Sequence, residues 1–129
     1  MEDGRFKLDD FELYRVAREF RKKTYRLVKL LPPEEKFALA NQVRRAAVSV
    51  TNNIAEGHGR WHYQENIRFC RIARGSVDEL IDDFNTCQDE NYGDPALVLD
   101  LRNDAYALIQ RINGYIAYLR KKKQGDDSP

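Results

Sequence analysis

The chain has 129 residues, of which 42% are hydrophobic and 33% charged, and its formal net charge is +1. A chain of this size buries about two thirds of its unfolded surface, so one domain can fold without a disulfide or a structural metal. The near-zero net charge excludes a strongly basic or acidic protein, and no apolar run reaches the roughly 20 residues of a membrane helix. The polar start of the sequence has no export-signal pattern, so we expect a cytoplasmic protein that does not bind membranes.

The first two predicted helices have apolar residues spaced three and four apart. One runs from about residue 9 to residue 31, and its inner face comprises Leu13, Ala17, Phe20, Thr24, Leu27 and Leu31. The second begins at Pro33, since proline is tolerated in a first helical turn, and its inner face comprises Phe37, Ala40, Val43, Ala47, Val50 and Ile54. We expect Gly57 or Gly59 to end this helix in the left-handed conformation that glycine adopts readily.

The third and fourth predicted helices are longer. The third runs from about residue 63 to residue 90, and its inner face comprises Phe69 or Cys70, Ala73, Val77, Leu80, Phe84 and Cys87. The fourth follows a break at residues 91–93, with Asp94 as its N-cap and Pro95 in its first turn. Its inner face comprises Leu97, Leu101, Ala105, Leu108 or Ile109, Ile112, Ile116 and Leu119.

Four helices joined by short loops, with no alternating strand pattern, predict an all-α fold, an antiparallel up-down-up-down four-helix bundle. We expect residues 1–129 to form a single domain, with a frayed N-terminus at about residues 1–8 and a frayed C-terminal tail at about residues 122–129. The third helix holds both cysteines, Cys70 and Cys87, about 25 Å apart, so both are expected to be free thiols.

Charge is unevenly distributed along the sequence. Arg60 and Trp61 form one candidate for nucleic-acid or partner binding, because arginine holds phosphates and aromatic rings stack on bases. The first helix carries the other candidate, a basic run of Arg18, Arg21, Lys22, Lys23, Arg26 and Lys29. Residues 78–94 carry only acidic charges. Other interpretations stay open: an ordinary solvated face, a surface that docks the acidic run of another copy or, for Trp61, a cap on the core.

The sequence predicts no catalytic, cofactor-binding or metal-binding residues. His58 and His62 are four residues apart, but Gly59 interrupts the helix between them, so a solvated pair is favoured over a metal site. The acidic run lacks the Glu-x-x-His motif of di-metal bundles. One enzymatic alternative stays open, a magnesium-dependent nuclease that uses Asp78, Asp82 and Asp83.

Small residues indicate where the second and third helices pack closely. They are Ala46, Ala47 and Ser49 on one helix and Gly75 and Ser76 on the other. A hairpin that turns near Gly59 predicts the contacts Ala46–Ala73, Ser49–Cys70 and Asn53–Asn66, with Arg44 or Arg45 near Asp78 or Glu79. A buried polar pair of this kind would fix the register of the two helices at some cost in stability.

The stretch LPPEEKFALANQVRRAAVSVTNNIAEGHGR, followed by FCRIARGSVDEL, resembles the bacterial four-helix-bundle family of 23S rRNA intervening-sequence proteins. The matching residues span positions 31–80, with Val50 in place of the usual isoleucine. Among them we expect a structural motif of Arg44, Arg45, Ser49, Asn53, Glu56, Gly57, Gly75, Ser76 and Glu79.

The resemblance implies a short bundle that assembles into a homopentameric ring. It also implies a relation to the accessory variability protein of diversity-generating retroelements, a basic pentamer that binds a reverse transcriptase and nucleic acid. The near-zero net charge of this chain departs from that protein, and the family has no assigned catalytic residues. In such a ring, unlike-charged flanks would pair head to tail, and Asn53, Glu56 and Arg60 would form a hydrogen-bonded latch at the bundle end.

The sequence therefore predicts a non-enzymatic, self-associating helical bundle that acts as an adaptor for nucleic acid, RNA in particular, or for protein. Its expected partners are further copies of itself, RNA or DNA, and a nucleic-acid-processing enzyme. The alternative is a purely structural oligomer, or a protein-interaction module without affinity for nucleic acid.

Overall fold

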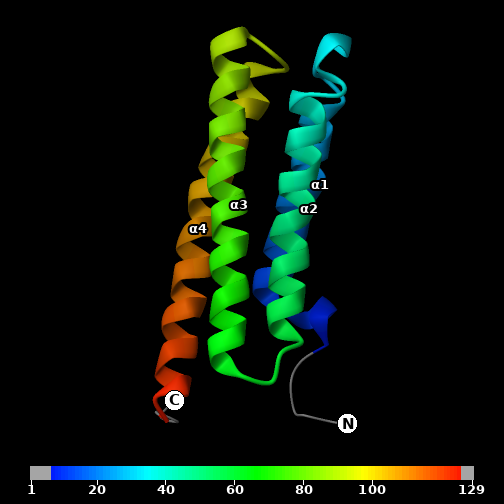
Figure 1. Cartoon of the computed structure of the whole chain (residues 1–129). Coiled ribbons are helices and arrows are strands. Elements are labelled where there is room, and N and C mark those ends of the chain that lie inside the picture. Colours follow the sequence, from blue (N-terminus) through cyan, green and yellow to red (C-terminus); the bar gives the residue numbers. More distant parts are fainter. Residues whose placement is uncertain (1–6, 126–129) are drawn as a thin grey trace.

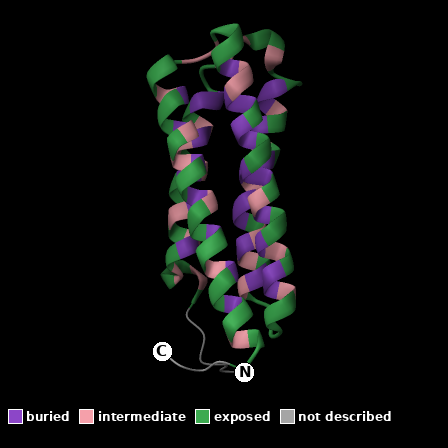
Figure 2. Cartoon of the chain, turned by 90° about the vertical axis from the view of Figure 1, so that its left-hand side faces the viewer, coloured by how far each residue is buried: buried purple, intermediate pink, exposed green. Residues whose placement is uncertain are grey.

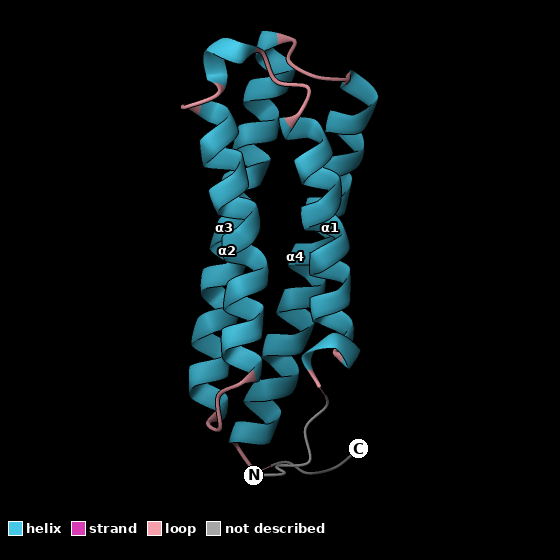
Figure 3. Ribbon diagram, turned by 90° about the vertical axis from the view of Figure 1, so that its right-hand side faces the viewer, coloured by secondary structure: helices cyan, strands magenta, loops and turns pink. Residues whose placement is uncertain are grey.

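The computed structural model describes residues 7–125, and these residues form four long helices and two short 3-10 turns, with no strand among them. The elements are η1 (Leu8–Asp10), α1 (Glu12–Val28), η2 (Pro33–Glu35), α2 (Leu39–His58), α3 (Tyr63–Glu90) and α4 (Pro95–Lys123). Consecutive helices run in opposite directions and pack side by side, and α1 also packs on α4 (Figure 1, Figure 3). The predicted all-α four-helix bundle is confirmed.

The core consists of one buried stripe from each helix, which lies along the inner side of the bundle (Figure 2). Most of the predicted inner positions are buried, and the two alternatives resolve in favour of Cys70 over Phe69 and Leu108 over Ile109. The rings of Phe20 and Phe84 meet edge to face at the centre, with centroids 6.4 Å apart. Two predicted inner residues, Leu31 and Leu97, are only partly buried. Val28 near the end of α1 and Val98 near the start of α4 are buried in their place.

The start of α2 differs from the prediction. Residues 33–35 form a separate 3-10 turn. Ala38, at φ −118° and ψ −99°, is not helical and separates this turn from α2, which begins at Leu39. Oε1 of Glu35 accepts a hydrogen bond from the backbone N–H of Leu39 (3.3 Å), which satisfies one of the unpaired donors of the first turn. Phe37 lies in the interruption and is 86% exposed, so its predicted place in the core is wrong.

The end of α2 uses glycine for close packing and not for a left-handed turn. Neither predicted glycine has a positive φ: Gly59 has φ −77°, and Gly57 lies inside the helix. A Cβ at Gly57 would lie 2.6 Å from Oδ1 of Asn66 and 3.2 Å from Cβ of Phe69, so only glycine lets α3 approach here. The small-residue role predicted for Gly75 is wrong, because that residue is exposed and a Cβ there would meet no atom within 4 Å.

The register of the α2–α3 hairpin also differs from the prediction. The hydroxyls of Ser49 and Ser76 are 2.8 Å apart, whereas the sequence predicts that Ser49 meets Cys70. The chain turns over residues 59–62, so the centre of the turn lies further along than Gly59, and this shifts the pairing along α3. Asn66 consequently donates to the hydroxyl of Tyr115 on α4 (3.0 Å) and not to Asn53.

Several local predictions hold. Asp94 caps α4 by accepting a hydrogen bond from the N–H of Ala96 (3.1 Å). Cys70 and Cys87 are buried free thiols, and burial is the main cause that raises the pKa of each to about 11.

The two ends that were predicted to fray are partly helical. Leu8 belongs to η1 and α4 continues to Lys123, while residues 1–6 and 126–129 lie outside the described range. No helix within residues 7–125 combines the length and apolarity of a membrane span.

Candidate nucleic-acid interface

The basic run of α1 divides into two groups by the direction of its side chains. Arg18, Lys22, Arg26 and Lys29 are exposed and follow one another at intervals of four, four and three residues, so they form a single stripe along the helix. Lys22 makes an exposed ion pair with Glu19 (3.3 Å), which contributes little to stability. The side chains of Arg18, Arg26 and Lys29 have no hydrogen bond or ion pair with any described residue. We call these four residues the α1 basic stripe.

The other two cations of the run hold neighbouring helices. Nη1 of Arg21 donates a hydrogen bond to Oγ1 of the buried Thr51 on α2 (2.9 Å). Nζ of Lys23 lies 2.8 Å from Oδ2 of Asp104 and 3.9 Å from Oδ2 of Asp100, both on α4. Both side chains are therefore already occupied within the bundle, and the predicted six-residue set reduces to four available cations.

A groove of about 460 Å³ lies between α1 and α2. It is lined by Tyr25 from α1 and by Arg44, Arg45, Val48, Ser49, Asn52 and Asn53 from α2. No carboxylate lines it, and neither Arg44 nor Arg45 forms an ion pair or hydrogen bond with a described residue. Arg45 lines a groove between α2 and α3 together with Glu79, so the predicted proximity holds for this pair, but no ion pair forms between them. The two guanidinium groups are therefore available to an anion.

The back of this groove is fixed by a polar network. Nδ2 of Asn53 donates to the carbonyl oxygen of Ser49 (2.8 Å) and lies 3.0 Å from its hydroxyl, which in turn bonds Ser76 on α3. The predicted latch forms only in part: Arg60 pairs with Glu56 (2.6 Å), while Asn53 bonds Ser49 instead. The network therefore orients Ser49 and Asn53 on the groove wall, about one and two helical turns from Arg45.

Tyr25 connects the groove to the α1 basic stripe. It is three residues from Lys22 and four from Lys29, so the three side chains are neighbours on the helix surface. Tyr25 is half-buried and presents an aromatic ring beside cations, the combination with which proteins stack bases and hold phosphates. The stripe and the α1–α2 groove together form the candidate nucleic-acid interface.

Arg60 and Trp61 lie outside this interface. They belong to the α2–α3 turn, at the end of the bundle where α1 begins and far from Lys29, where α1 ends (Figure 1). Trp61 is 60% exposed, and the guanidinium of Arg60 lies 5.1 Å from the centre of the Phe69 ring. The structure does not bring the two predicted cationic clusters together.

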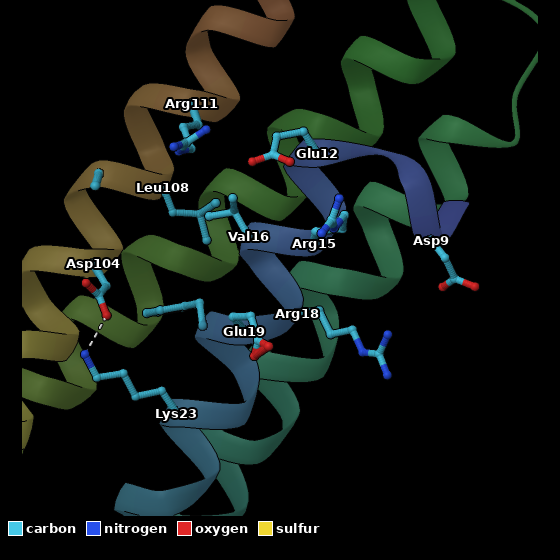
Figure 4. Close-up of a pocket in the computed structure, with 12 residues that line it drawn as sticks. Asp9, Glu12, Arg15, Val16, Arg18, Glu19, Lys23, Asp104, Leu108 and Arg111 are labelled. Carbon is cyan, nitrogen blue, oxygen red and sulfur yellow. Dashed lines mark hydrogen bonds and ion pairs between the residues drawn. The ribbon is translucent and has the colours of Figure 1, made fainter. Parts of the chain in front are cut away.

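A second groove, between α1 and α4, has mixed charge. It measures about 540 Å³, and Figure 4 shows acidic and basic side chains alternating around it, with the Lys23–Asp104 pair at one edge. Its four carboxylates come from Asp9, Glu12, Glu19 and Asp104, and its four cations from Arg15, Arg18, Lys23 and Arg111. Balanced charge gives this groove no electrostatic preference for a polyanion.

The open enzymatic alternatives gain no support from the geometry. Among residues 7–125, no group of three His, Cys, Asp or Glu side chains is arranged to hold a metal ion. The ring of His58 stacks on Phe11, with centroids 4.9 Å apart. Of the proposed nuclease acids, Asp78 and Asp82 are exposed, whereas Asp83 is buried.

These features define a small four-helix bundle with a cationic groove and stripe on one side. The chain belongs to the family described as 23S rRNA-intervening sequence protein, whose model matches residues 9–114. No curated protein matches it.

Among solved structures, the chain is similar to a protein of unknown function from the S23 ribosomal protein family of Bacteroides thetaiotaomicron. The two superpose with a TM-score of 0.74 at 21% sequence identity, over 81% of this chain and 97% of the other. At this identity the likeness shows the fold alone.

The sequence prediction misses three residues of the α1–α2 groove, because Tyr25, Val48 and Asn52 are not among the predicted site residues. It includes Arg44 and Arg45, but in a structural motif and not in a binding site. The helical repeat carries a signal for the groove, because Arg45, Val48, Ser49 and Asn52 are spaced by three, one and three residues on one face of α2. That α1 contributes Tyr25 follows only from the packing of the two helices.

Proposed function

We propose that this protein is a non-enzymatic adaptor that binds nucleic acid, RNA in the first instance, through the stripe and the α1–α2 groove. The observation that carries the proposal is the set of unpaired cations: Arg18, Arg26, Lys29, Arg44 and Arg45 have no partner among the described residues. A folded chain with almost equal numbers of acids and bases has many carboxylates with which to pair them, yet these five remain open. Their availability suits an external polyanion.

Each part of the interface has a role in this proposal. The stripe and the two arginines neutralise phosphates, which supplies affinity without sequence preference. Tyr25 offers a stacking surface for an unpaired base, and the amides of Asn52 and Asn53 offer hydrogen bonds to base edges. Single-stranded RNA is the first ligand to test, since the family name refers to 23S rRNA and exposed bases can reach an open groove.

The proposal includes self-association. α1 and α3 occupy diagonal corners of the bundle, because each packs on α2 and α4. The α1 basic stripe and the acidic residues of α3 therefore face in different directions and cannot neutralise each other within one chain. Between copies they would pair head to tail in a heterologous interface, which closes into a ring when the rotation permits, and the family resemblance suggests a pentamer.

The experiment measures binding of a fluorescent single-stranded RNA by anisotropy at about 50 mM salt. We expect R44Q/R45Q to weaken binding by about tenfold or more, because two guanidinium–phosphate contacts are lost. The matched control is R71Q/R120Q, which removes the same charge from exposed positions outside the interface and is expected to change affinity by less than about threefold. Equal losses of affinity in the two variants would mean that binding depends only on the net charge of the protein, and would contradict the proposed interface.

A second candidate is a structural oligomer or protein-interaction module without affinity for nucleic acid. It is favoured by a groove of about 430 Å³ on the α2–α3 face, where Ile72 is 44% exposed and Gly75 leaves an open backbone. Sedimentation of K22E/R26E/K29E separates the candidates. Loss of assembly with no RNA binding in the unaltered protein would establish the second candidate. A pull-down with and without nuclease would then show whether a nucleic-acid-processing enzyme is retained.

A further inference from the structure

Asp83 on α3 is a buried carboxylate without a partner. Its residue is only 8% exposed, yet it has no hydrogen bond or ion pair with any described residue. Burying an ionised carboxylate is costly unless a donor or a cation compensates it. Among the described residues, Nε of Arg102 is the only fully enclosed side-chain N or O atom without a partner, so the oxygens of Asp83 keep some exposure at the groove that the residue lines, where a ligand can reach them.

The residues around Asp83 make its ionised form still less favourable. Asp83 lines a groove of about 670 Å³ between α2 and α3, together with three further carboxylates, Glu35, Glu79 and Asp82. The one cation on the groove wall, Arg45, pairs with none of them. Burial first, and then the charges of Asp82 and Glu79, raise the pKa of Asp83 to about 6. We call this the acidic groove.

The arrangement of the acids limits the class of ligand. Within the described residues the carboxylates do not converge as metal ligands do, and a polyanion would be repelled. Glu35 is already engaged, since its two oxygens accept from the N–H of Leu39 (3.3 Å) and the hydroxyl of Tyr92 (2.9 Å). The unpaired acids Glu79, Asp82 and Asp83 are instead spaced along α3, so they match cationic groups that are themselves spaced along a chain.

The same groove contains apolar surface beside its acids. Phe37 lies between η2 and α2 and is 86% exposed on the groove wall. Its ring centre lies 5.4 Å from the ammonium group of Lys36. Aromatic rings attract alkylammonium groups and cover methylene chains. The groove volume is within the range of small-molecule sites.

We propose that the acidic groove binds an aliphatic polyamine, with one ammonium group on Asp83, another between Asp82 and Glu79, and the methylene chain along Phe37. The ligand replaces the missing partner of the buried carboxylate. Arg45 lines both this groove and the α1–α2 groove, so the two sites adjoin. They can still be tested separately, because Asp83 and Phe37 line only the acidic groove.

The test is calorimetric titration of the full chain with spermidine at low salt and about pH 7.5. We expect D83N to weaken spermidine binding by about tenfold or more, because the principal acceptor loses its charge. The matched control D89N removes an exposed acid from the same helix outside the groove, and its affinity is expected to stay within about twofold. Equal weakening by both variants, or no binding by the unaltered protein, would overturn the proposal.

Further arms distinguish the class of ligand and guard against misfolding. F37A is expected to weaken spermidine binding several-fold while leaving the acids and the fold in place, since Phe37 is outside the core. Binding is expected to weaken below about pH 6, where Asp83 gains a proton beside Glu35, Arg45, Glu79 and Asp82. Asp83-dependent binding of Mg²⁺ or of an arginine-rich peptide in preference to spermidine would make this a metal or protein site and refute the polyamine assignment.

Discussion

The α1 basic stripe and the acidic groove are two charged regions that differ in how far their side chains are exposed to solvent. Both come from dense runs of like charge in the sequence. On α1, the four stripe cations extend into solvent, where water screens them from one another. On α3, one acid of the run, Asp83, is 8% exposed, and the nearby charges of Asp82 and Glu79 add to the rise that burial causes in its pKa.

The contrast shows that density of charge does not by itself identify a binding site. The exposed cations of the stripe cost the fold little. Only the lack of partners of Arg18, Arg26 and Lys29, and the position of the stripe beside the α1–α2 groove, suggest a function. The buried acid does cost the fold stability, since no cation or donor among the described residues pairs with it. Four predictions follow this contrast, from the largest expected effect to the smallest.

The largest effect is expected on RNA affinity. Neutralising the stripe in K22Q/R26Q/K29Q removes three exposed cations and is expected to weaken RNA binding about 50-fold, or roughly 2.3 kcal/mol, while the free energy of unfolding changes by less than about 0.5 kcal/mol. Anisotropy and urea denaturation measure the two quantities. A matched triple variant at exposed positions, R71Q/R120Q/K121Q, should bind RNA almost as well as the unaltered protein. An equally large loss of affinity in this control would mean that RNA does not prefer the α1 basic stripe to other exposed cations.

The acidic groove is expected to show the opposite pattern, with a gain in stability. D83N removes the cost of a buried ionised carboxylate and should raise the free energy of unfolding by about 2 kcal/mol at about pH 7.5, after allowance for the new unpaired amide. Urea denaturation measures the gain, and D89N is the control expected to show none. A loss of stability in D83N would mean that Asp83 has a stabilising partner.

The pH dependence of stability isolates the same carboxylate. Its pKa in the folded chain, about 6, lies above the reference value of 3.8, so the folded state binds the proton more tightly than the unfolded state. Stability from this group is therefore gained as pH falls, by about 1.4 kcal/mol between pH 7.5 and pH 5. Unfolding of the unaltered protein and D83N at both pH values gives the difference, in which other titrating groups cancel. Parallel behaviour of the two proteins would contradict the assignment.

The smallest effect is expected at Ser49, which lies between the two charged regions. Ser49 lines the α1–α2 groove and also bonds Ser76 on the face toward α3. S49A should cost about 1 kcal/mol of stability, because the buried hydroxyl of Ser76 loses its partner. In a double-mutant cycle, S49A/S76A should cost less than the sum of the single variants, whereas simple additivity would mean that the hydrogen bond contributes nothing.

Local signals in the sequence were enough to predict much of the fold. The bounds of α3, the cap at Asp94 and most inner residues follow from helical spacing and from residues that begin and end helices. The prediction is wrong for Phe37, because its spacing fits a continuous helix and the backbone at Ala38 is not helical. The roles of Gly57 and Gly75 are reversed because a glycine's use depends on how closely the neighbouring helix approaches, which spacing does not reveal.

The candidate sites were predictable only in part. Exposure of Arg18 or Arg26 follows from their place opposite the apolar stripe of α1. Arg45 lies beside Glu79 on a groove wall, as the sequence predicts, but the lack of an ion pair between them does not follow from helical spacing. Asp83 belongs to a run expected to be solvated, and only the packed hairpin shows that it is buried.

The most direct test of the nucleic-acid interface is the salt dependence of RNA binding by the unaltered protein and by R44Q/R45Q. Each phosphate contact contributes about 0.7 to the slope of log K against log salt for a single strand. Loss of both arginines should therefore reduce the steepness of the slope by about 1.4, and R71Q/R120Q should leave it unchanged. An identical slope for the unaltered protein and R44Q/R45Q would contradict the account.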